Sequence, residues 1–597
     1  MSLLEVKHLN IRYNDVAVVN GVSFKVSRGE SVGIVGESGS GKSQTALSLL
    51  GLLPGNAKLT GSIIFDGEEL ANKSNKKLDR VRGRRIGIVF QDPMQALNPY
   101  LRIGQQLRLV LLQHELANNK DADAKVIAML QRVGLPDPER QFRAYPHELS
   151  GGMRQRVMIA SALICEPDLL IADEPTTALD VTVQAQILDL LEELRDDTAL
   201  LLITHDLGIV AGRCERLLVL EAGKLIESGA TTSVFSSPEN PHTRKLLAAA
   251  LRTDRGEIQE PNNGKTVLGV EGASVSFRNA AKDQLVAVAD VSLSLRKGET
   301  LAIVGESGSG KSSLVRALLG LIPMRAGRAV YAGEALEGPV QSRAASQRRD
   351  LQLVFQDPVS ALNPSLRVSA IVGEPLLVHQ AKLSRAGRSE RVIAILKKVG
   401  LDESYLRRYP HQLSGGQAQR VAIARALILE PKILICDEAV NALDGTVRQQ
   451  VLELLKNVQR ESGLSIIFIS HDLAVVRSIS HRVAVMYLGR LVEIADTAKL
   501  FSKPSHPYTK ALLDASPVPD PRVAPVRAPL RGETPSPLTP PSGCAFHPRC
   551  AFAANICVEK KPALRDADGS RVACHRVDEI DLRISMPGVK TTASPGR

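Results

Sequence analysis

The stretch VGESGSGKS occurs at Val35–Ser43 and again at Val304–Ser312. Three further strings recur in the same order: FQDP from Phe90 and Phe355, LSGG from Leu149 and Leu413, and THDL or SHDL from Thr204 and Ser470. The two copies of each string lie between 264 and 269 residues apart, so order and spacing are both preserved. Chance does not keep four strings in register. The sequence therefore predicts two homologous domains in tandem.

Short apolar runs alternate with longer helical patterns in both copies. We expect buried strands at Ser31–Val35, Ile86–Phe90, Leu169–Ala172 and Leu200–Thr204, with counterparts at Leu301–Val304, Leu351–Phe355, Ile433–Cys436 and Ser465–Ser470. Runs that are polar on neither face and are separated by helices indicate a mostly parallel sheet covered on both sides. The expected fold class is therefore α/β, with two phosphate-loop domains and a C-terminal tail.

Composition gives the expected domain boundaries. The first domain spans residues 1–251 and the second spans 266–516, separated by a polar linker at 252–265. Residues 517–597 form a C-terminal extension, in which Pro517–Pro541 holds nine prolines in 25 residues. This part should be extended and semi-rigid. A segment with four cysteines follows it.

The overall composition is that of a soluble globular protein. The 597 residues are 44% hydrophobic and 23% charged, which excludes a collagenous, disordered or membrane-embedded chain. No apolar run reaches the ~18 residues that cross a bilayer, and charges near the N-terminus argue against a signal peptide. The net charge of +11 decides nothing alone, but 3% aromatic residues argue against base-stacking platforms for single-stranded nucleic acid.

The repeated GESGSGKS matches the pattern of a phosphate-binding loop between a strand and a helix. Its small residues let backbone N–H groups wrap phosphates at a helix N-terminus. Lys42 and Lys311 supply a charge for the outer phosphates, and the hydroxyls of Ser43 and Ser312 are expected to hold Mg²⁺. The other predicted loop contacts are Gly36, Ser38, Gly39 and Gly41 in the first copy and Gly305, Ser307, Gly308 and Gly310 in the second.

Two acids follow a buried strand in each copy, within LLIADE and ILICDE. Asp173 and Asp437 stand where the strand emerges, which suits them to hold Mg²⁺ through water. Glu174 and Glu438 come next and are expected to orient or deprotonate an attacking water. A helix N-cap is the other interpretation of such a pair, and the upstream phosphate loop favours the catalytic one.

Taken together, these motifs resemble an ATP-binding cassette (ABC) domain. The order is a phosphate loop, a glutamine after a strand, LSGG, the acidic strand end, an ALD string and a histidine after a strand. The likeness covers nearly all of residues 1–516, twice. LSGG separates this family from other phosphate-loop ATPases.

The resemblance implies further roles at the nucleotide. Gln91 and Gln356 would contact Mg²⁺ and sense a transmembrane partner, and His205 and His471 would touch the γ-phosphate. The remaining implied contacts are Ser150, Gly152, Ser414 and Gly416 in the LSGG strings, Asp180 and Asp444 in the ALD strings, and Tyr13 and Phe277 on adenine. Phe277 is the weaker candidate because about five extra residues precede the second loop.

Neither copy loses its lysine, glutamine, signature serine, glutamate or histidine. Pro175 of the first copy becomes Ala439 in the second, which we interpret as a backbone adjustment. Two competent ATP sites are therefore expected, each built from the phosphate loop of one copy and the LSGG of the other.

Finer strings resemble ATPases of the dipeptide, oligopeptide and nickel importer family. They are FQDPMQALNPY and FQDPVSALNPS, YPHELSGG and YPHQLSGG, NPHTRKLL and SHPYTKALL, and the C-terminal GCAFHPRC. The resemblance implies an ATP-hydrolysing motor of a peptide importer, peripheral at the cytoplasmic face of the inner membrane. Its partners would be two transmembrane permease subunits and an extracytoplasmic substrate-binding protein.

A soluble tandem ABC protein that acts on the ribosome or on nucleic acid is the alternative. Ribosome-acting members carry a long charged helical linker between cassettes, whereas this linker is short and holds Pro, Asn and Gly. DNA-repair members insert long coiled coils or zinc modules into the cassette, and the intact spacing excludes them. No nucleic-acid partner is therefore expected, and the cargo is not encoded in this chain.

The tail carries Cys544, Cys550, Cys557 and Cys574. A reducing cytoplasm disfavours disulfides, and zinc usually takes a closely spaced cysteine pair that is absent here. Four thiolates are the ligand set of a [4Fe–4S] cluster. The similar tails of peptide-importer ATPases imply such a cluster first, with zinc and then free thiols as the alternatives. His547 and His575 are interpreted as outer donors or plain polar residues.

Overall fold

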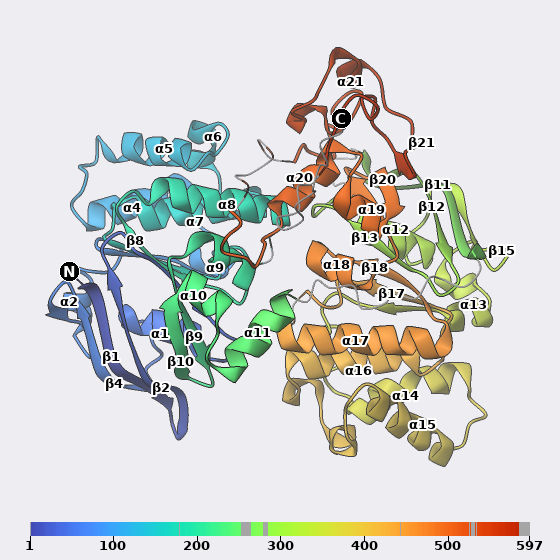
Figure 1. Cartoon of the computed structure of the whole chain (residues 1–597), viewed down its shortest axis with the longest axis horizontal. Coiled ribbons are helices and arrows are strands. Elements are labelled where there is room, and N and C mark those ends of the chain that lie inside the picture. The colour runs from blue at the N-terminus through green and yellow to red at the C-terminus, as the bar shows by residue number, and fades with distance from the viewer. Residues whose placement is uncertain are drawn as a thin grey trace, which may run out of the picture. The chain divides into compact units, whose positions relative to one another are not determined.

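The computed structural model describes residues 2–177, 179–251, 264–278, 284–441, 443, 445–524, 526, 530, 532 and 534–583 (Figure 1). The chain divides into two compact units. One contains Met1–Leu251 and Pro517–Ala528, and the other contains Arg252–Ser516 and Pro529–Arg597. Each unit has one large and one small sheet with helices, which confirms the α/β class.

The large sheet of the first unit has the strand order β10-β9-β3-β8-β7-β6. Its strands are β3 (Ser31–Val35), β6 (Ile86–Val89), β7 (Leu169–Asp173), β8 (Ala199–Ile203), β9 (Arg216–Glu221) and β10 (Lys224–Ala230). All pairs are parallel except β9 with β10. The segments that follow β3, β6, β7 and β8 therefore emerge at one edge.

An antiparallel sheet and a layer of helices cover the two faces of this sheet. The antiparallel sheet has the order β2-β1-β4-β5, with β1 (Ser2–Tyr13), β2 (Val16–Ser27), β4 (Ala57–Phe65) and β5 (Glu68–Glu69). Leu201 and Ile203 of β8 pack toward it, whereas Leu200 and Leu202 pack in the core that the helices share. This alternation follows from the two-residue period of a strand, and it explains why the run is apolar throughout.

The helices of the first unit include a subdomain formed by α4 (Ile103–Gln113), α5 (Ala122–Arg132) and α6 (Pro138–Arg143), which lie beside one another in Figure 1. The others are α1 (Lys42–Leu49), α2 (Asn75–Leu78), α3 (Pro93–Ala96), α7 (Gly151–Leu163), α8 (Val181–Leu194), α9 (Leu207–Arg213), α10 (Thr231–Ser236) and α11 (Pro241–Leu251).

The second unit repeats this plan and extends it. Its large sheet has the order β16-β17-β18-β13-β19-β20-β22-β21, and its small sheet has the order β12-β11-β14-β15. The strands are β11 (Thr266–Arg278), β12 (Gln284–Arg296), β13 (Thr300–Val304), β14 (Ala326–Tyr331), β15 (Glu334–Ala335), β16 (Leu351–Val354), β17 (Ile433–Asp437), β18 (Ser465–Ile469), β19 (Arg482–Tyr487), β20 (Arg490–Asp496), β21 (Arg565–Ala567) and β22 (Ser570–Val572).

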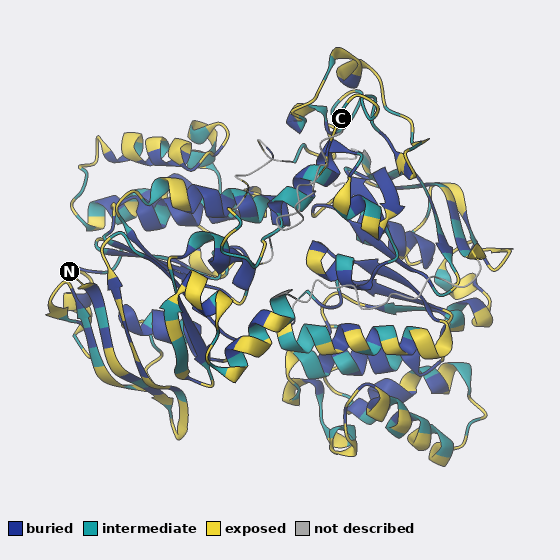
Figure 2. Ribbon diagram, viewed as in Figure 1, coloured by how far each residue is buried: buried dark blue, intermediate teal, exposed yellow. Residues whose placement is uncertain are grey.

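The helices of the second unit again form a core layer and a subdomain. They are α12 (Lys311–Leu318), α13 (Ala345–Asp350), α14 (Val368–His379), α15 (Arg385–Lys398), α16 (Gly415–Leu427), α17 (Gly445–Ser462), α18 (Leu473–Ile479), α19 (Thr497–Ser502), α20 (Pro507–Ala515) and α21 (Asn555–Glu559). Figure 2 shows the central strands of both large sheets as buried, while the subdomain helices expose one face. Among the described residues, no helix is long and apolar enough to cross a membrane.

The tail contributes two strands that the sequence did not predict. β22 pairs with β20 through Glu493 and Val572, so the tail covers the edge of the large sheet. The strands β21 and β22 have three residues each, which is too short for a periodicity signal. The eight predicted strands all exist, and each end lies within one residue of its predicted position.

Two matched ion pairs fix the turn before the central strand. Arg482 Nη1 lies 3.1 Å from Glu299 Oε1, and these side chains are 14% and 0% exposed. In the first unit Arg216 Nε lies 2.9 Å from Glu30 Oε1, with 29% and 17% exposure. Each glutamate also accepts a backbone N–H from three residues earlier.

Arg482→Met should therefore destabilise the protein by about 3–5 kcal/mol, because it leaves the Glu299 charge buried without its partner. Arg216→Met is the matched control and should cost about 1 kcal/mol, since its pair is partly solvated. Calorimetric unfolding of both variants would measure the difference. Equal costs would show that burial does not set the strength of this pair.

Candidate functional site

Both large sheets bring four loops to one edge. The phosphate loop follows the central strand, and the adjacent strands β8, β7 and β6 are followed by His205, the Asp173–Glu174 pair and Gln91. The second unit repeats this order with β13, β18, β17 and β16. The phosphate loop, the histidine, the acidic pair and the glutamine of each unit are therefore brought to one edge of that unit's own sheet.

Glycine is required where each phosphate loop enters its helix. Gly41 and Gly310 both have φ of 95°, in the left-handed region. A Cβ would lie 2.8 Å from the Val18 carbonyl oxygen at Gly41 and 2.1 Å from the Ala287 carbonyl oxygen at Gly310. Gly36 and Gly305 are buried at the start of the loops, whereas Ser38, Gly39, Ser307 and Gly308 are exposed.

The loop lysines are held by their own loops. Lys42 Nζ donates to the carbonyl oxygens of Gly36 at 2.8 Å and Glu37 at 2.9 Å. Lys311 Nζ makes the same contacts with Gly305 at 2.8 Å and Glu306 at 2.9 Å. These hydrogen bonds hold each ammonium inside its loop, close to the backbone N–H groups that would bind a phosphate.

The loop serines meet the strand-end aspartates. Ser43 Oγ donates to Asp173 Oδ1 at 3.0 Å, and Ser312 Oγ donates to Asp437 Oδ1 at 2.8 Å. Burial raises the pKa of both aspartates, and the serine hydrogen bonds offset part of that shift. The predicted oxygen ligands for Mg²⁺ therefore lie together in both units.

In the first unit Glu174 connects the glutamine to the histidine. Gln91 Nε2 donates to Glu174 Oε2 at 3.1 Å, and His205 Nδ1 lies 3.3 Å from Glu174 Oε1. Burial, the largest single influence, raises the pKa of Glu174, but the hydrogen bond and charge of His205, the Thr177 hydroxyl and the Lys42 charge together outweigh it and lower the pKa. Glu174 has φ of 46° and Glu438 has φ of 50°, a conformation that non-glycine residues adopt rarely and often at functional sites.

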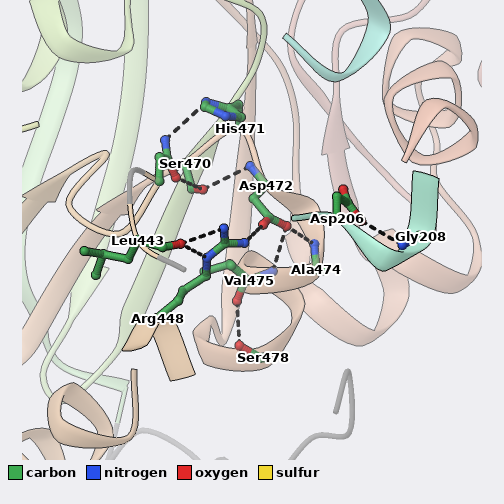
Figure 3. Close-up of polar contacts among 11 residues, drawn as sticks. Asp206, Gly208, Leu443, Arg448, Ser470, His471, Asp472, Ala474, Val475 and Ser478 are labelled. Carbon is green, nitrogen blue, oxygen red and sulfur yellow. Dashed lines mark hydrogen bonds and ion pairs between the residues drawn. The ribbon is translucent and has the colours of Figure 1, made fainter. Parts of the chain in front are cut away.

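The second unit arranges its histidine differently. Gln356 Nε2 still donates to Glu438 Oε2, at 2.7 Å, but His471 Nδ1 lies 3.9 Å from Glu438 Oε1. His471 instead contacts Asn441 Nδ2 at 3.2 Å, while Ser470 Oγ donates to Asn441 Oδ1 at 3.1 Å (Figure 3). In the first unit Thr177 occupies the position of Asn441, and its hydroxyl donates to Glu174 Oε2 at 2.9 Å.

A second residue missed from sequence is Arg448 of α17. Its Nη1 donates to Asp472 Oδ2 at 2.6 Å and its Nη2 donates to the Leu443 carbonyl oxygen at 3.0 Å (Figure 3). Asp472 caps α18, so Arg448 connects the ALD string to the loop that carries His471. Gln184 stands at this position in the first unit. Comparing the two copies position by position would have revealed both differences.

The signature serines cap the helices that follow them. Ser150 Oγ accepts the N–H of Met153 at 3.2 Å, and Ser414 Oγ accepts the N–H of Gln417 at 3.4 Å. A Cβ at Gly152 would lie 3.0 Å from Val183 Cγ1 and one at Gly416 would lie 2.5 Å from Val447 Cγ1, so a larger residue would require these valine side chains to shift. Asp180 stands directly before α8. Asp444 lies outside the described residues.

The two predicted adenine contacts occupy the same position in their sheets. Tyr13 pairs with Val16 at the end of β1, and its hydroxyl donates to Gln44 of α1. Phe277 pairs with Leu285 at the end of β11 and is 38% exposed. The ladder thus aligns Phe277 with Tyr13, and the extra residues come after Phe277 in the sequence.

The four tail cysteines line one small cavity, together with His506, Phe546, His547, His575 and Arg576. Burial raises the pKa of Cys544 and Cys550, and that of Cys574 to about 11. The rings of His547 and His575 contact the backbone carbonyl oxygens of Cys544 and Lys560. Within the described residues, no three His, Cys, Asp or Glu side chains stand close enough to hold a single metal ion.

Known proteins resemble this chain along both units. The family described as ABC transporter matches residues 19–177 and 288–441, and the oligopeptide/dipeptide transporter C-terminal region matches residues 492–557. The glutathione import ATP-binding protein GsiA of Salmonella typhimurium is 42% identical over 582 residues, covering 89% of this chain and 93% of that protein. The GsiA protein of Shigella flexneri is also 42% identical over 579 residues, covering 90% and 93%.

Solved structures match part of the chain. A dimeric bacterial ABC transporter cassette is 28% identical, covers 38% of this chain and 98% of that chain, and has a TM-score of 0.36. The cbiO1 protein of Clostridium perfringens is 32% identical, covers 40% and 91%, and has a TM-score of 0.35.

The geometry predicts opposite tautomers for the two histidines when both are neutral. A carboxylate donates nothing, so Nδ1 of His205 must carry the hydrogen that reaches Glu174. An amide nitrogen is a donor, so Nδ1 of His471 must be bare and the hydrogen must sit on Nε2. Asn441→Thr should move His471 to the tautomer of His205, and Thr177→Asn should do the reverse. Nitrogen NMR of histidine-labelled protein measures this, and identical tautomers in the parent protein would contradict the prediction.

Proposed function

This chain belongs to the ABC transporter family and is the ATPase of a peptide importer; from this premise we propose how its two units power import and what its tail holds. The observation that carries the proposal is the 42% identity to import ATP-binding proteins, which covers 89% of this chain. Two complete sets of phosphate-loop, glutamine, glutamate and histidine side chains support it.

We propose that Lys42 and Lys311 bind the outer phosphates of ATP while the loop amides wrap them. Mg²⁺, when bound, would be held by Ser43 and Gln91 in one unit and by Ser312 and Gln356 in the other, and would neutralise phosphate charge. Asp173 and Asp437 would act on the ion through water. Tyr13 and Phe277 would stack on adenine.

Hydrolysis is assigned to Glu174 and Glu438. A lowered pKa keeps each carboxylate ionised near neutrality, so it can accept a hydrogen bond or a proton from the attacking water. Neutral His471 would donate its Nε2 hydrogen to the γ-phosphate, whereas His205, whose neutral form carries its hydrogen on Nδ1, would donate from Nε2 only as the imidazolium. The LSGG string of each cassette, with the aspartate of its ALD string, would complete the ATP site of the other cassette.

We propose that the cargo is a short peptide, with glutathione as the first compound to test, because the relatives are glutathione import proteins. An extracytoplasmic binding protein would deliver it to two permease subunits, and the chain would lie at the inner face of the membrane. The same relatives weigh against action on the ribosome or nucleic acid.

A groove in the second unit fits a permease helix. It is lined by exposed apolar side chains of Leu321, Phe355 and Val378, together with Glu374 and Arg425. Phe355 directly precedes Gln356, which contacts Glu438. A helix bound against Phe355 would therefore shift Gln356, and Gln356 would in turn shift the hydrolytic carboxylate of Glu438.

We further propose that the tail cavity holds a [4Fe–4S] cluster. The four cysteines line one cavity, which suits a shared group, and among the described residues no three His, Cys, Asp or Glu side chains are placed to hold a single ion. A cluster is larger than an ion, and four cysteine thiolates are its usual ligands. The bound irons would favour the thiolate forms that burial disfavours.

Glu174→Gln and Glu438→Gln should each lower ATP hydrolysis at least ~100-fold at their own site, because the amide cannot accept a proton. ATP should stay bound, since the phosphate loops are unchanged. The double variant should be inactive. Phosphate release in membranes that also contain the permease, together with retained nucleotide, would measure both effects. Glu193→Gln, on an exposed turn of α8, is the control and should behave as the parent. A normal rate for Glu438→Gln would show that the second site contributes no turnover.

Anaerobic purification should yield about four irons and four acid-labile sulfides per chain. Cys574→Ser should lose most of both, because it removes one ligand. Cys165→Ser changes a buried cysteine outside the tail and should retain both. Stoichiometric zinc without iron, or no metal at all, would overturn the cluster.

A further inference from the structure

One arginine of the tail reaches the phosphate loop of the second unit. Arg549 Nη1 donates to Glu306 Oε2 at 2.8 Å and Arg549 Nη2 donates to Glu306 Oε1 at 3.1 Å. The two side chains are 3% and 2% exposed. Two parallel hydrogen bonds from a rigid guanidinium fix the position of a carboxylate as well as its charge.

Glu306 is held at every polar group that it carries. Thr534 Oγ1 donates to Glu306 Oε2 at 2.8 Å, and the Glu306 N–H donates to Tyr508 Oη at 2.9 Å. Its carbonyl oxygen accepts the 2.9 Å hydrogen bond from Lys311 Nζ. A single residue therefore joins Arg549 to the lysine that would bind the outer phosphates.

The same arginine borders the four-cysteine cavity. Arg549 directly precedes Cys550, and Phe546, which lines the cavity, lies two residues after Cys544. The Phe546 ring packs on Tyr487 and Tyr508, with ring centroids 5.3 Å apart in both pairs. The cavity, this aromatic cluster and the phosphate loop are thus continuous within one unit.

The first unit is built differently at these positions. Glu221 and His242 stand where Tyr487 and Tyr508 stand in the second unit, and they pair with each other at 2.9 Å. Glu37, the counterpart of Glu306, is half-buried rather than buried. Within the second unit, Arg549 of the tail therefore contacts the phosphate loop of that same unit.

We propose that the four-cysteine tail positions the second ATP site, and that Arg549 is the positioning residue through which the cysteine site acts on the phosphate loop. A buried ion pair adds little net stability compared with apolar side chains of the same size, so stability alone does not account for it. It does fix geometry, which a phosphate loop requires. This proposal rests on the ATPase function and deepens it by assigning a control to one of the two sites.

The test compares the two ATP sites in the same molecule. Full-length protein is photolabelled with 8-azido-ATP over a concentration series, digested, and the labelled peptides of each unit are quantified. For Arg549→Met, Arg549→Lys and the double variant Glu306→Gln with Arg549→Met, half-saturation of the second site should shift upward about tenfold or more. The first site should keep its parent value in all three.

Thermal unfolding separates positioning from a purely structural role. Arg549→Met leaves Glu306 charged and unpaired, so its melting temperature should fall. The double variant removes both charges and should recover most of that loss, yet keep the weakened second site. If the double variant recovered the labelling of the parent along with its stability, the proposal would be overturned. Labelling equal to the parent in Arg549→Lys, which keeps the charge but loses the planar guanidinium, would also overturn it.

Arg565→Met supplies the matched control, because Arg565 lies in the same tail and pairs with Asp578 at the surface. It should label both sites as the parent does, and a shift equal to that of Arg549→Met would overturn the specific role of Arg549. Failure of the ATPase function itself looks different, since neither unit of the parent protein would then be labelled.

Discussion

The parallel order of four strands is the constraint on which both sites depend. Ser43 and Asp173 are 130 residues apart in the chain, yet their side chains are 3.0 Å apart because β3 and β7 flank β8 in one sheet and end at the same edge. Neither the phosphate loop nor the acidic strand end binds Mg²⁺ and phosphate alone. The buried, apolar strands hold these ends rigidly, so the loops that follow can be short, strained and polar without losing their geometry. The left-handed backbone at Glu174 and Glu438 is tolerated for the same reason.

Much of this could be predicted from the sequence, because buried strands are continuous apolar runs and a phosphate loop has few possible sequences. The loop serines do meet the strand-end aspartates and the glutamines meet the glutamates, and the register of the small sheets aligns Phe277 with Tyr13 despite the unequal spacing. What escaped prediction depends on contacts between distant side chains. Asn441 and Arg448 belong to no motif and matter only because of where His471 and Asp472 lie. The strand β22 is three residues long and exists because β20 offers it an open edge.

The two ATP sites share their motifs but not their surroundings. All three differences lie in the second unit: His471 is held by an amide, the ALD string is tied to the cap of α18, and the phosphate loop is tied to the tail. In the first unit His205 contacts the Glu174 carboxylate instead, Gln184 stands in place of Arg448, and Glu37, the counterpart of Glu306, is half-buried. The two sites are therefore held by different groups before nucleotide binds. Identical motifs in two copies do not imply identical behaviour.

The tail has two anchors in the second unit. One anchor is Arg549 on Glu306, and the other is β22 on β20, where Glu493 also accepts the backbone N–H groups of Ser505 and His506. Cys550 and Cys557 lie between the anchors in the chain, while Cys544 and Cys574 lie just outside them, so all four cysteines are close in sequence to a fixed point and few residues remain to be ordered when a group binds. If the cysteine site is empty or damaged, the Arg549–Glu306 contact and the β20–β22 pairing alone hold this part of the tail in place. Because Arg549 is held by Glu306 of the phosphate loop, a change in the structure of the cysteine site would also change the geometry of the second ATP site.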